Sequence, residues 1–383
     1  MSLFIAAFAL LLFGITLSNV LFWPRLRVVA QDGILCRVSV LIPARNEETN
    51  LSACLDAVLV QGELIQEILI YDDHSTDATR AIIERYVARD ARVRLIDAQP
   101  LAAGWCGKNF ACAQLAAAAA QPYLLFIDAD ARLLPHAAAR MVTEMQRRQL
   151  TLLSCWPGLE MHSFAERALM PLLNTVVFST FPGVLSLLFT KGFPSLGLAH
   201  GACLMFERAA YERLGGHESV KDQIFEDTRL AQLWRARGER ALGLDGQDIV
   251  RVRMYESFAD IWAGFQKNFF PAFQHEASFW LFIALHLAVY LAPFWLALFT
   301  FNKFWLSAAA LMFGVRVLLA LRFKHPLWSA LLHPFTEPLL IALGLSSYWR
   351  CKSGRGVRWK GRSYLQQENQ KETQRVKVTK IQS

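Results

Sequence analysis

The pattern of apolar and polar residues between positions 37 and 153 alternates between two kinds of segment. Short, uninterrupted apolar runs occur at 38–42, 67–71, 93–96, 123–127 and 150–153, and longer helix-like stretches separate them at 49–60, 76–88, 109–120 and 135–148. Apolar runs of this length predict strands buried on both faces, and strands that alternate with helices predict βαβ units. The pattern therefore predicts an α/β domain with a mostly parallel sheet.

An apolar segment precedes this region. Residues 3–23 contain no charged side chain, which is enough for one membrane-spanning helix, and Arg25 and Arg27 follow them. Because positive charges mark the cytosolic end of a span and no small-residue cleavage site follows, we expect residues 1–24 to form an uncleaved anchor. The next domain would then lie in the cytosol. A secretory signal is the alternative.

Apolar and basic residues divide the C-terminal part of the chain. Three apolar blocks, at roughly 279–301, 304–321 and 327–349, predict membrane segments within 279–349. The tail at 350–383 has ten Lys or Arg against two acidic residues, an excess of eight that equals the net charge of the whole chain. Such a tail is typical of the cytosolic side, and of contact with anionic lipid rather than with nucleic acid.

Three crossings by these blocks would place the basic tail outside the cell, against that tendency. Either one block is re-entrant, or the tail is external. The third block is the candidate for re-entry because Pro334 and Pro338 interrupt it beside His333 and Glu337. Ionisable residues at membrane depth are costly unless they are functional.

Two further segments are apolar without resembling simple spans. Met170 to Phe189 lacks charge and contains two prolines and a glycine, which predicts a broken segment at the membrane interface and a path for a lipid acceptor. Core packing beneath the sheet is the alternative. Residues 257–276 are rich in Phe and Trp and predict an interfacial amphipathic helix. The domain between the membrane segments therefore covers residues 35–256.

Polar residues follow three of the predicted strands, in the loops that begin at Pro43, Asp72 and Asp128. Carboxyl ends of parallel strands meet at one edge of an open sheet, which is where ligands bind. Asp128 and Asp130 supply hard oxygen ligands for Mg²⁺ or Mn²⁺, an ion that shares its shell with substrate phosphates. Helix capping is the alternative, but Pro135 would start the next helix too late for either carboxylate to cap it.

The loops also exclude two classes of nucleotide-binding protein. The first loop contains neither Gly-x-Gly-x-x-Gly nor a phosphate loop, which argues against dinucleotide oxidoreductases and phosphate-loop NTPases. A carboxylate such as Asp72 can instead bind a nucleoside through a ring N–H or a ribose hydroxyl, whereas Ser75 and Asp77 are expected to cap the next helix. Lys108 is expected at a helix start that favours phosphate, with a solvated surface lysine as the alternative.

The ordered motifs Ile-Pro-Ala-Arg-Asn-Glu, Tyr-Asp-Asp-His-Ser-Thr-Asp, Gly-Lys-x-x-Ala and Asp-Ala-Asp resemble those of family 2 glycosyltransferases of the GT-A fold. Gly215-Gly-His217 followed by Phe225-Glu-Asp-Thr228 is similar to the acceptor-side motif of that family. Arg253-Met-Tyr255 with Gly264-Phe-Gln-Lys267 is similar to its bacterial isoprenoid-lipid branch, which includes hopanoid-associated and carotenoid glycosyltransferases.

The resemblance implies roles for individual residues. The nucleoside would be held by Pro43, Arg45, Glu47, Asp72 and Asp73. Lys108 and Asp128 would complete the donor site, and Asp130 would bind the metal on the diphosphate. Asp227 would be the base, oriented together with the acceptor by Glu226, because inversion needs a carboxylate that is not neutralised by metal. A plain helix start is the alternative for the Glu-Asp pair.

One departure from the family concerns chain growth. Polymerising members carry Gln-x-x-Arg-Trp after the base, and this sequence does not contain it. Lys267, with Arg253, would meet the leaving diphosphate instead, which fits a single transfer.

The resemblance therefore implies a plasma-membrane enzyme, with its catalytic domain in the cytosol, that moves one hexose with inversion. The donor would be a nucleotide sugar, expected to be UDP-linked, and the acceptor a carotenoid or hopanoid-like lipid. The alternatives are a polysaccharide or polyprenyl-phosphate sugar synthase and an inactive GT-A membrane scaffold. A nucleotidyltransferase would be expected to have a glycine-rich first loop, which this chain lacks.

Overall fold

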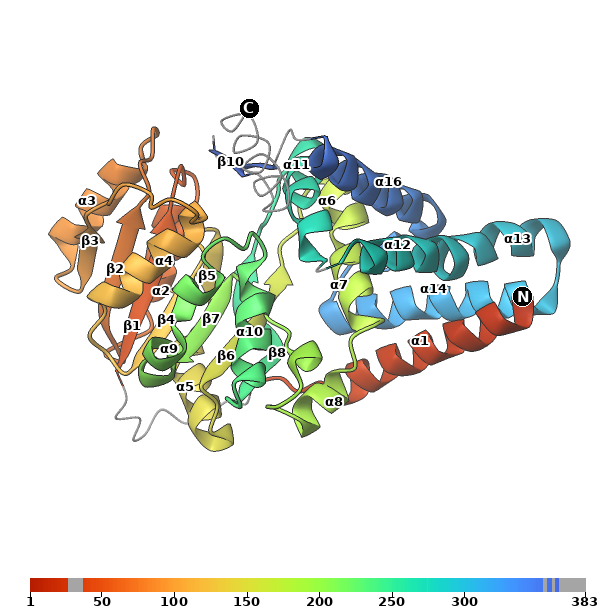
Figure 1. Ribbon diagram of the computed structural model, residues 1–383, viewed down its shortest axis with the longest axis horizontal. Helices are drawn as coiled ribbons and strands as arrows, with labels where there is room; N and C mark the ends of the chain where they lie inside the picture. The colour runs from red at the N-terminus through yellow and green to blue at the C-terminus, as the bar shows by residue number, and fades with distance from the viewer. Residues whose placement is uncertain (27–36, 274, 354–356, 360–361, 365–383) are drawn as a thin grey trace, which may run out of the picture.

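The computed structural model describes residues 1–26, 37–273, 275–353, 357–359 and 362–364. A membrane-type helical bundle and an α/β domain lie at opposite ends of the molecule, and shorter helices lie between them (Figure 1). The predicted basic tail falls mostly outside the described residues. Within it, the short strands β9 (Val357–Trp359) and β10 (Arg362–Tyr364) pair as an antiparallel hairpin.

The α/β domain contains an eight-stranded sheet with the order β3-β2-β1-β4-β7-β6-β8-β5. The first four are β1 (Val38–Ala44), β2 (Ile65–Asp72), β3 (Val93–Ile96) and β4 (Tyr123–Ile127), and they pair in parallel as predicted. The others are β5 (Ala131–Leu133), β6 (Leu152–Leu159), β7 (Cys203–Glu207) and β8 (Ala241–Val252). β7 is antiparallel to both β4 and β6, and β5 is antiparallel to β8, so the sheet is mixed.

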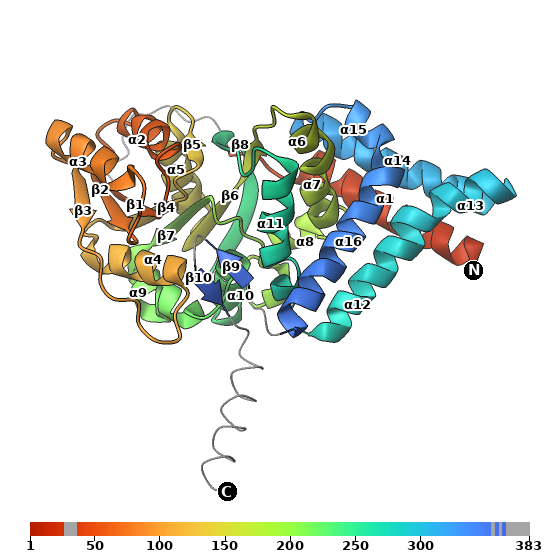
Figure 2. The same cartoon turned by 90° about the horizontal axis from the view of Figure 1, so that it is seen from above.

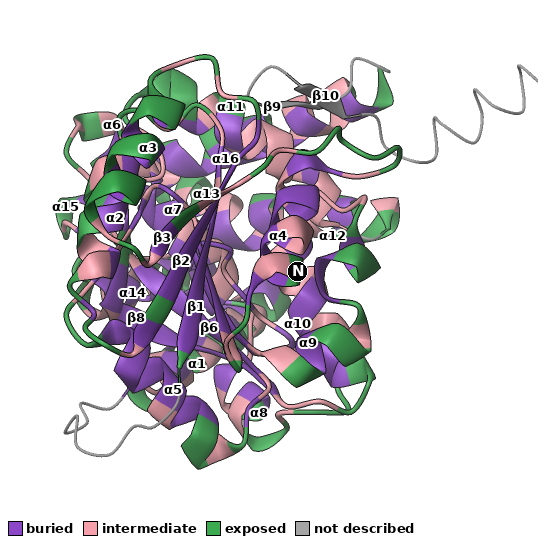
Figure 3. Cartoon of the chain, turned by 90° about the vertical axis from the view of Figure 1, so that its left-hand side faces the viewer, coloured by how far each residue is buried: buried purple, intermediate pink, exposed green. Residues whose placement is uncertain are grey.

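Helices cover both faces of this sheet, which explains why the strands are continuous apolar runs. One face packs against α2 (Leu51–Leu59), α3 (Thr79–Arg89) and α5 (Ala137–Arg148). The other packs against α4 (Gly107–Ala118), α9 (Arg208–Leu214) and α10 (Glu226–Ala236). Within β4, Leu125 belongs to the first core and Phe126 to the second, because successive strand residues point to opposite faces. Figure 3 shows the strands in the colour of buried residues between these helices.

Among the described residues, three helices are long and apolar enough to cross a membrane, judged by length and composition: Ser2–Phe22, Glu276–Thr300 and Lys303–Phe323. The first is α1 and the third is α14. The second consists of α12 (Glu276–Leu285), a π-helical turn (His286–Leu291) and α13 (Ala292–Thr300). All three lie side by side in Figures 1 and 2 and share one apolar core.

The third predicted C-terminal block differs from these spans. It forms the short helix α15 (Trp328–Leu331) and then α16 (His333–Lys352), which contains Pro338. This block is not among the candidate spans of the described chain. Crossings at α1, α12–α13 and α14 would return the chain to the side of the α/β domain. The expected departure of the third block from a simple span therefore fits the structure.

Helices between the sheet and the bundle complete the fold. The segment predicted to be broken consists of α7 (Pro171–Phe178) and α8 (Gly183–Leu188), after the short α6 (Phe164–Leu169). α7 packs against α14 and α8 against α1. Both also contact the sheet, because Phe178 of α7 packs against Trp156 of β6 and Leu187 of α8 packs against the sheet core. The predicted amphipathic helix is α11 (Phe258–Asn268), which ends earlier than expected, is followed by a 3-10 turn (Phe270–Ala272) and packs against α16.

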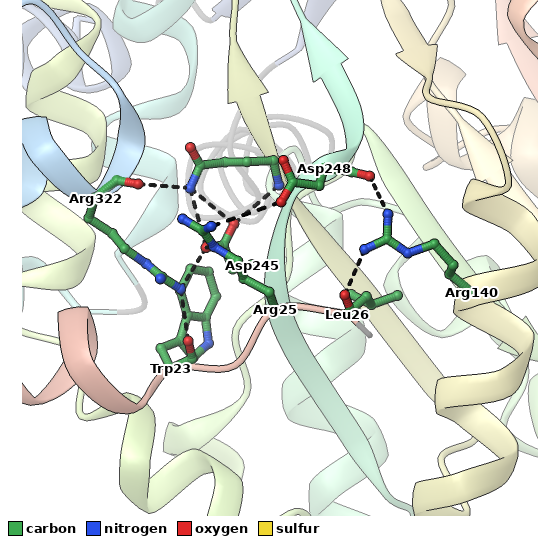
Figure 4. Close-up of polar contacts among 8 residues, drawn as sticks. Trp23, Arg25, Leu26, Arg140, Asp245, Asp248 and Arg322 are labelled. Atoms are coloured by element: carbon green, nitrogen blue, oxygen red, sulfur yellow. Dashed lines mark hydrogen bonds and ion pairs between the residues drawn. The ribbon is translucent and has the colours of Figure 1, made fainter. Parts of the chain in front are cut away.

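A buried carboxylate connects the bundle to the sheet (Figure 4). Asp245 of β8 is 3.1 Å from the Arg25 Nε and 2.6 Å from the Arg322 Nη2, at the ends of α1 and α14. The Arg322 guanidinium also donates to the Trp23 carbonyl at 2.8 Å. Arg140 of α5 donates to the carbonyls of Leu26 and Asp248, each at 2.6 Å. The ends of two candidate spans are thus held against the same strand.

Candidate functional site

A cavity of about 530 Å³ lies between the carboxyl edge of the sheet and the helices α7, α11 and α16. Ten of the residues singled out in the sequence line it. Six come from the end of β1 and from the loops after β1, β2 and β4: Pro43, Arg45, Glu47, Asp73, Asp128 and Asp130. Four come from α4, α10 and α11: Lys108, Glu226, Asp227 and Lys267. Residues up to 224 positions apart in the sequence, from Pro43 to Lys267, therefore share one space.

The Lys108 ammonium lies between two carboxylates in this cavity. Its Nζ is 2.8 Å from Asp128 Oδ1 and 3.0 Å from Glu226 Oε1. Burial alone would lower the pKa of Lys108, but the charges of Asp128 and Glu226 together raise it by more. The pKa therefore lies well above its ordinary value, and the ammonium group is charged. Lys108 is at the start of α4 as expected. It is paired within the cavity rather than solvated at the surface.

Asp227 is held by backbone amides in the first turn of α10. Its Oδ1 accepts the Thr228 N–H at 2.6 Å, and the Gly201 N–H also donates to the carboxylate. Burial raises its pKa to about 7, with a further contribution from the negative charge of Glu226 beside it. The Glu-Asp pair does begin a helix, but both side chains also line the cavity. A carboxylate with this pKa can accept a proton near neutral pH.

The loops after β1 and β2 are tied together by hydrogen bonds and an ion pair. Arg45 Nη1 donates to the Asp73 carbonyl at 2.5 Å and lies 3.8 Å from its carboxylate. Glu47 N–H donates to the Thr79 hydroxyl at 2.7 Å. These contacts hold Arg45, Glu47 and Asp73 at the cavity wall.

The side chains of Asp77 and Asp72 form hydrogen bonds to the backbone of the loop after β2. Asp77 accepts the backbone N–H of Thr79, the first residue of α3, at 3.0 Å, although the N-cap position itself is Ala78. Asp72 differs from our expectation, because it does not line the cavity and accepts the Ser75 N–H at 3.1 Å. Its carboxylate is engaged in shaping the turn, so direct nucleoside contact by Asp72 is not supported.

The turn between β4 and β5 presents Asp128 and Asp130 to the cavity. The described residues contain no group of three or more His, Cys, Asp or Glu side chains that could hold a metal by itself. Mg²⁺ and Mn²⁺ sites that bind nucleotides need only one or two carboxylates, since phosphates and water complete the shell. Asp128 is paired with Lys108, and Asp130 lines the cavity from the same turn. The carboxylates on this turn are therefore suitable ligands for Mg²⁺ or Mn²⁺ when a nucleotide is bound.

Tyr255 packs behind Asp130 and explains one glycine of the C-terminal motif. Burial and the charge of Asp130 raise the pKa of Tyr255. A Cβ at Gly264 of α11 would lie 2.2 Å from the Tyr255 ring. Only glycine lets α11 approach this closely, so Gly264 sets the distance between α11 and the carboxylate edge of the cavity.

The two cations expected at the leaving diphosphate lie in different places. Lys267 lines the cavity from α11. Arg253 does not line it, because its guanidinium is bound to Glu166 at 2.9 Å and 3.3 Å and to Glu256 at 3.3 Å. Two carboxylates already compensate its charge. Arg253 is therefore better explained as support for α6 than as a diphosphate ligand.

Three residues of the site were not found from the sequence. Asn109 is buried and donates to the carbonyls of Val220 and Gln223 at 2.7 Å and 2.9 Å, which ties α4 to the loop before α10. Gly201 and His200 line the cavity beside Asp227. A Cβ at Gly201 would be 3.1 Å from Lys108 Nζ and 3.4 Å from Asp227 Oδ2. The only local signal is polar and small residues before a strand, which is common in loops.

The other half of the cavity is apolar. It extends away from the carboxylates between α7, α11, α12 and α16, with walls that include Leu172, Val176, Phe265, Phe269, Phe282 and Leu340. Since α12 belongs to a candidate span, this arm reaches the part of the molecule suited to a membrane. The charged and apolar halves meet at His200, which lies near Asp128 and Lys108 and packs against Trp156, while the amide of the next residue, Gly201, binds Asp227.

Comparison with known proteins defines the class. Residues 39–215 match the model of the family described as "Glycosyl transferase family 2". The chain therefore contains a glycosyltransferase family 2 domain, and the eight-stranded mixed sheet is that of the GT-A fold. The mannosyltransferase PcManGT from Pyrobaculum calidifontis, in complex with GDP-Man and Mn²⁺, superposes over 91% of this chain and 99% of its own, with a TM-score of 0.53 and 19% identity. That likeness concerns the fold.

Curated relatives are similar to part of the chain. The 4,4'-diaponeurosporenoate glycosyltransferase of Staphylococcus haemolyticus is 30% identical over 227 residues, which is 57% of this chain and 57% of that protein. The protein of the same name from Staphylococcus aureus strain MRSA252 is 28% identical over 240 residues, which is 60% of each chain. The matched part thus spans less than two thirds of these relatives.

Proposed function

We propose that this protein transfers one sugar from a nucleotide sugar to a membrane lipid of the carotenoid type, with inversion at the anomeric carbon. The observation that carries this proposal is the form of the cavity. Carboxylates and lysines suited to a nucleotide sugar occupy one half, an apolar arm leads toward the membrane helices, and Asp227 lies where the halves meet. The names of the curated relatives support both the reaction and the carotenoid-type acceptor.

The donor half has the groups that a nucleoside diphosphate sugar requires. Arg45, Glu47 and Asp73 would contact the nucleoside, which we propose to be uridine, through charge-assisted hydrogen bonds. Lys108 and Lys267 would compensate the charge of the diphosphate as it leaves. Asp128 would keep Lys108 in place through their ion pair.

Asp227 would accept the proton of the attacking acceptor. As the acceptor oxygen forms a bond to the anomeric carbon, the bond from that carbon to the diphosphate oxygen breaks, and the proton passes to the Asp227 carboxylate. Glu226 supports this role through charge, because it helps to raise the pKa of Asp227 to about 7. Attack from the side opposite the leaving group produces inversion.

Asp130 would hold Mg²⁺ or Mn²⁺ on the donor diphosphate. Such an ion neutralises charge on the leaving group. Binding of UDP to the purified protein, measured by calorimetry with and without Mn²⁺, tests this part. We expect Asp130→Asn to remove the Mn²⁺-dependent gain in affinity, while equal gains in both proteins would contradict the assignment.

The catalytic domain would face the cytosol, where nucleotide sugars are made. The ends of α1 and α14 that lie against the sheet carry Arg25 and Arg322, and this positive charge supports a cytosolic catalytic domain with an external N-terminus. The apolar arm then opens toward the membrane from the cytosolic side. The lack of Gln-x-x-Arg-Trp supports a single transfer rather than polymer synthesis.

Mass spectrometry of membrane lipids tests the proposal as a whole. Cells that produce a carotenoid-type lipid would express the wild-type chain or Asp227→Asn. We expect a lipid heavier by one sugar residue with the wild type, and its loss with the variant at equal protein level. A lipid profile identical in both would contradict the proposed function, as an inactive scaffold predicts.

A further inference from the structure

His200 lies beside the base and is held there by the backbone. It is in the loop before β7, one residue from Gly201, whose amide binds Asp227. The backbone N–H of His200 donates to the Ser154 hydroxyl of β6 at 2.8 Å, and that hydroxyl lies 3.4 Å from the His200 carbonyl oxygen. Ser154 is buried, so this attachment is to the rigid part of the sheet.

The contacts of the imidazole determine which nitrogen carries the proton. Ala202 N–H donates to His200 Nδ1 at 3.2 Å, so Nδ1 is an acceptor. Burial lowers the pKa of His200 to about 4, and the ring is neutral at physiological pH. A neutral ring with an accepting Nδ1 has its hydrogen on Nε2. Across the described residues no hydrogen bond involves Nε2, although the side chain lines the cavity.

The ring is also oriented by packing. Its plane meets the Trp156 indole edge to face, with centroids 5.1 Å apart at 78°. Trp156 is buried and donates from Nε1 to Asn174 Oδ1 of α7 at 2.8 Å. The His200 ring therefore cannot turn freely without disturbing a buried tryptophan. A donor fixed in this way is preorganised.

The position of His200 identifies what this donor would meet. The charges of Asp128 and Lys108 act on the ring from the donor half, and Trp156 and Leu198 continue the wall into the apolar arm. The reacting end of a lipid acceptor must lie at this junction. Asp227 and Glu226 can only accept hydrogen bonds when ionised, and Lys108 is occupied by two carboxylates. An oxygen that gives its proton to Asp227 would have lone pairs in need of a donor.

We propose that His200 positions the acceptor, with its Nε2–H donating to the oxygen of the lipid that attacks the sugar. This inference rests on the proposed function. The hydrogen bond orients the nucleophile between His200 and Asp227, and it selects a lipid with a terminal oxygen group that carries a proton, either a hydroxyl or a carboxylic acid. A lipid without one would fill the apolar arm and remain unmodified.

Two substitutions at this position test the role. Leu removes the donor, while Gln can place an N–H near the position of Nε2. Transfer of radiolabelled sugar from UDP-sugars into the lipid phase is measured in membranes that contain wild type, His200→Leu or His200→Gln, together with UDP binding to the purified proteins. We expect His200→Leu to lower transfer about 10-fold or more, as loss of one oriented hydrogen bond implies, with UDP affinity unchanged. His200→Gln should recover a substantial part of transfer.

The outcomes separate this role from others. Equal transfer by His200→Leu and wild type would overturn the inference while the proposed function stands. A parallel loss of UDP binding in both variants would also overturn it, because it would show a donor-side or structural role. If the wild-type protein labels no lipid, the proposed function fails and this role fails with it.

Discussion

Lys108 Nζ lies 3.0 Å from Glu226 Oε1, and this ion pair joins the donor half of the cavity to the acceptor half. The same ammonium is 2.8 Å from Asp128, on the turn that also carries Asp130. One cation thus contacts the carboxylates on both sides of the position proposed for the sugar. Because Lys108 also lowers the pKa of Asp227, its removal should affect both halves.

Lys108→Met is expected to weaken UDP binding about 10-fold or more and to move the acidic limb of the pH–rate profile upward by ~1 pH unit. The first effect follows from loss of a cation near the phosphates. The second follows because Asp227 loses a stabilising positive charge. Calorimetry and transfer rates at several pH values measure the two effects. Lys221→Ala, at an exposed position near α10, is the matched control and should change neither. An unshifted limb would contradict the assigned electrostatics.

The raised pKa of Asp227 predicts how the transfer rate of the wild type changes with pH. The base must be ionised, so transfer should rise with pH and level off above pH 7, where the Asp227 pKa of about 7 is passed. Rates measured between pH 5.5 and about 8.5 check this. A transfer rate that falls over this range would show that Asp227 acts in its protonated form.

The raised pKa of Asp227 has the opposite effect on folding stability, which should fall as the pH rises. The folded pKa of Asp227 is raised above its ordinary value of 3.8, so its contribution to stability is fully present below pH 3.8 and is lost as the pH rises through 7. Ionisation of the base thus costs folding energy, which binding of donor and acceptor must offset. Asp227→Asn should remove this part of the pH dependence of thermal unfolding.

The ion pairs of Asp245 attach the helical bundle to the sheet, and their loss should lower the stability of the protein. Its side chain is fully buried and compensates Arg322 at 2.6 Å and Arg25 at 3.1 Å. Removal of the charge leaves a partly buried guanidinium without compensation, so Asp245→Asn should destabilise the protein by about 3 kcal/mol. Thermal unfolding in detergent measures the change. Asp248→Asn is the control, since this half-exposed carboxylate is 4.0 Å from Arg25 and should cost under about 1 kcal/mol. Equal effects of the two substitutions would contradict the role of Asp245.

Local patterns were sufficient for strands β1 to β4 and for much of the charged half of the cavity. The run at 123–127 is β4 residue for residue, because both faces of that strand are covered and its sequence is apolar throughout. The three loops after β1, β2 and β4 follow from the parallel arrangement. Glu226 and Asp227 were found through family resemblance, since their local sequence is also that of a helix start.

Contacts between distant segments could not be predicted in this way. Arg253 binds Glu166, which is 87 residues away, and no local signal distinguishes such a partner from a phosphate. β7 inserts antiparallel between β4 and β6, and this pairing places His200 and Gly201 beside the base. Strand pairing across this distance depends on the whole fold. His200 and Gly201 were therefore not predicted, because backbone pairing between distant strands positions them.

Blocking the apolar arm tests the central claim most directly, namely that one cavity serves both the nucleotide sugar and the lipid. Val176 of α7 lines the arm, and Val176→Trp would fill it, whereas Val184→Trp adds the same bulk to a separate hollow between α1 and α8. The measurement is transfer of labelled sugar into the lipid phase, with UDP binding determined for each protein. We predict that Val176→Trp binds UDP like the wild type and loses lipid labelling, while Val184→Trp keeps both. Undiminished labelling by Val176→Trp would contradict the account.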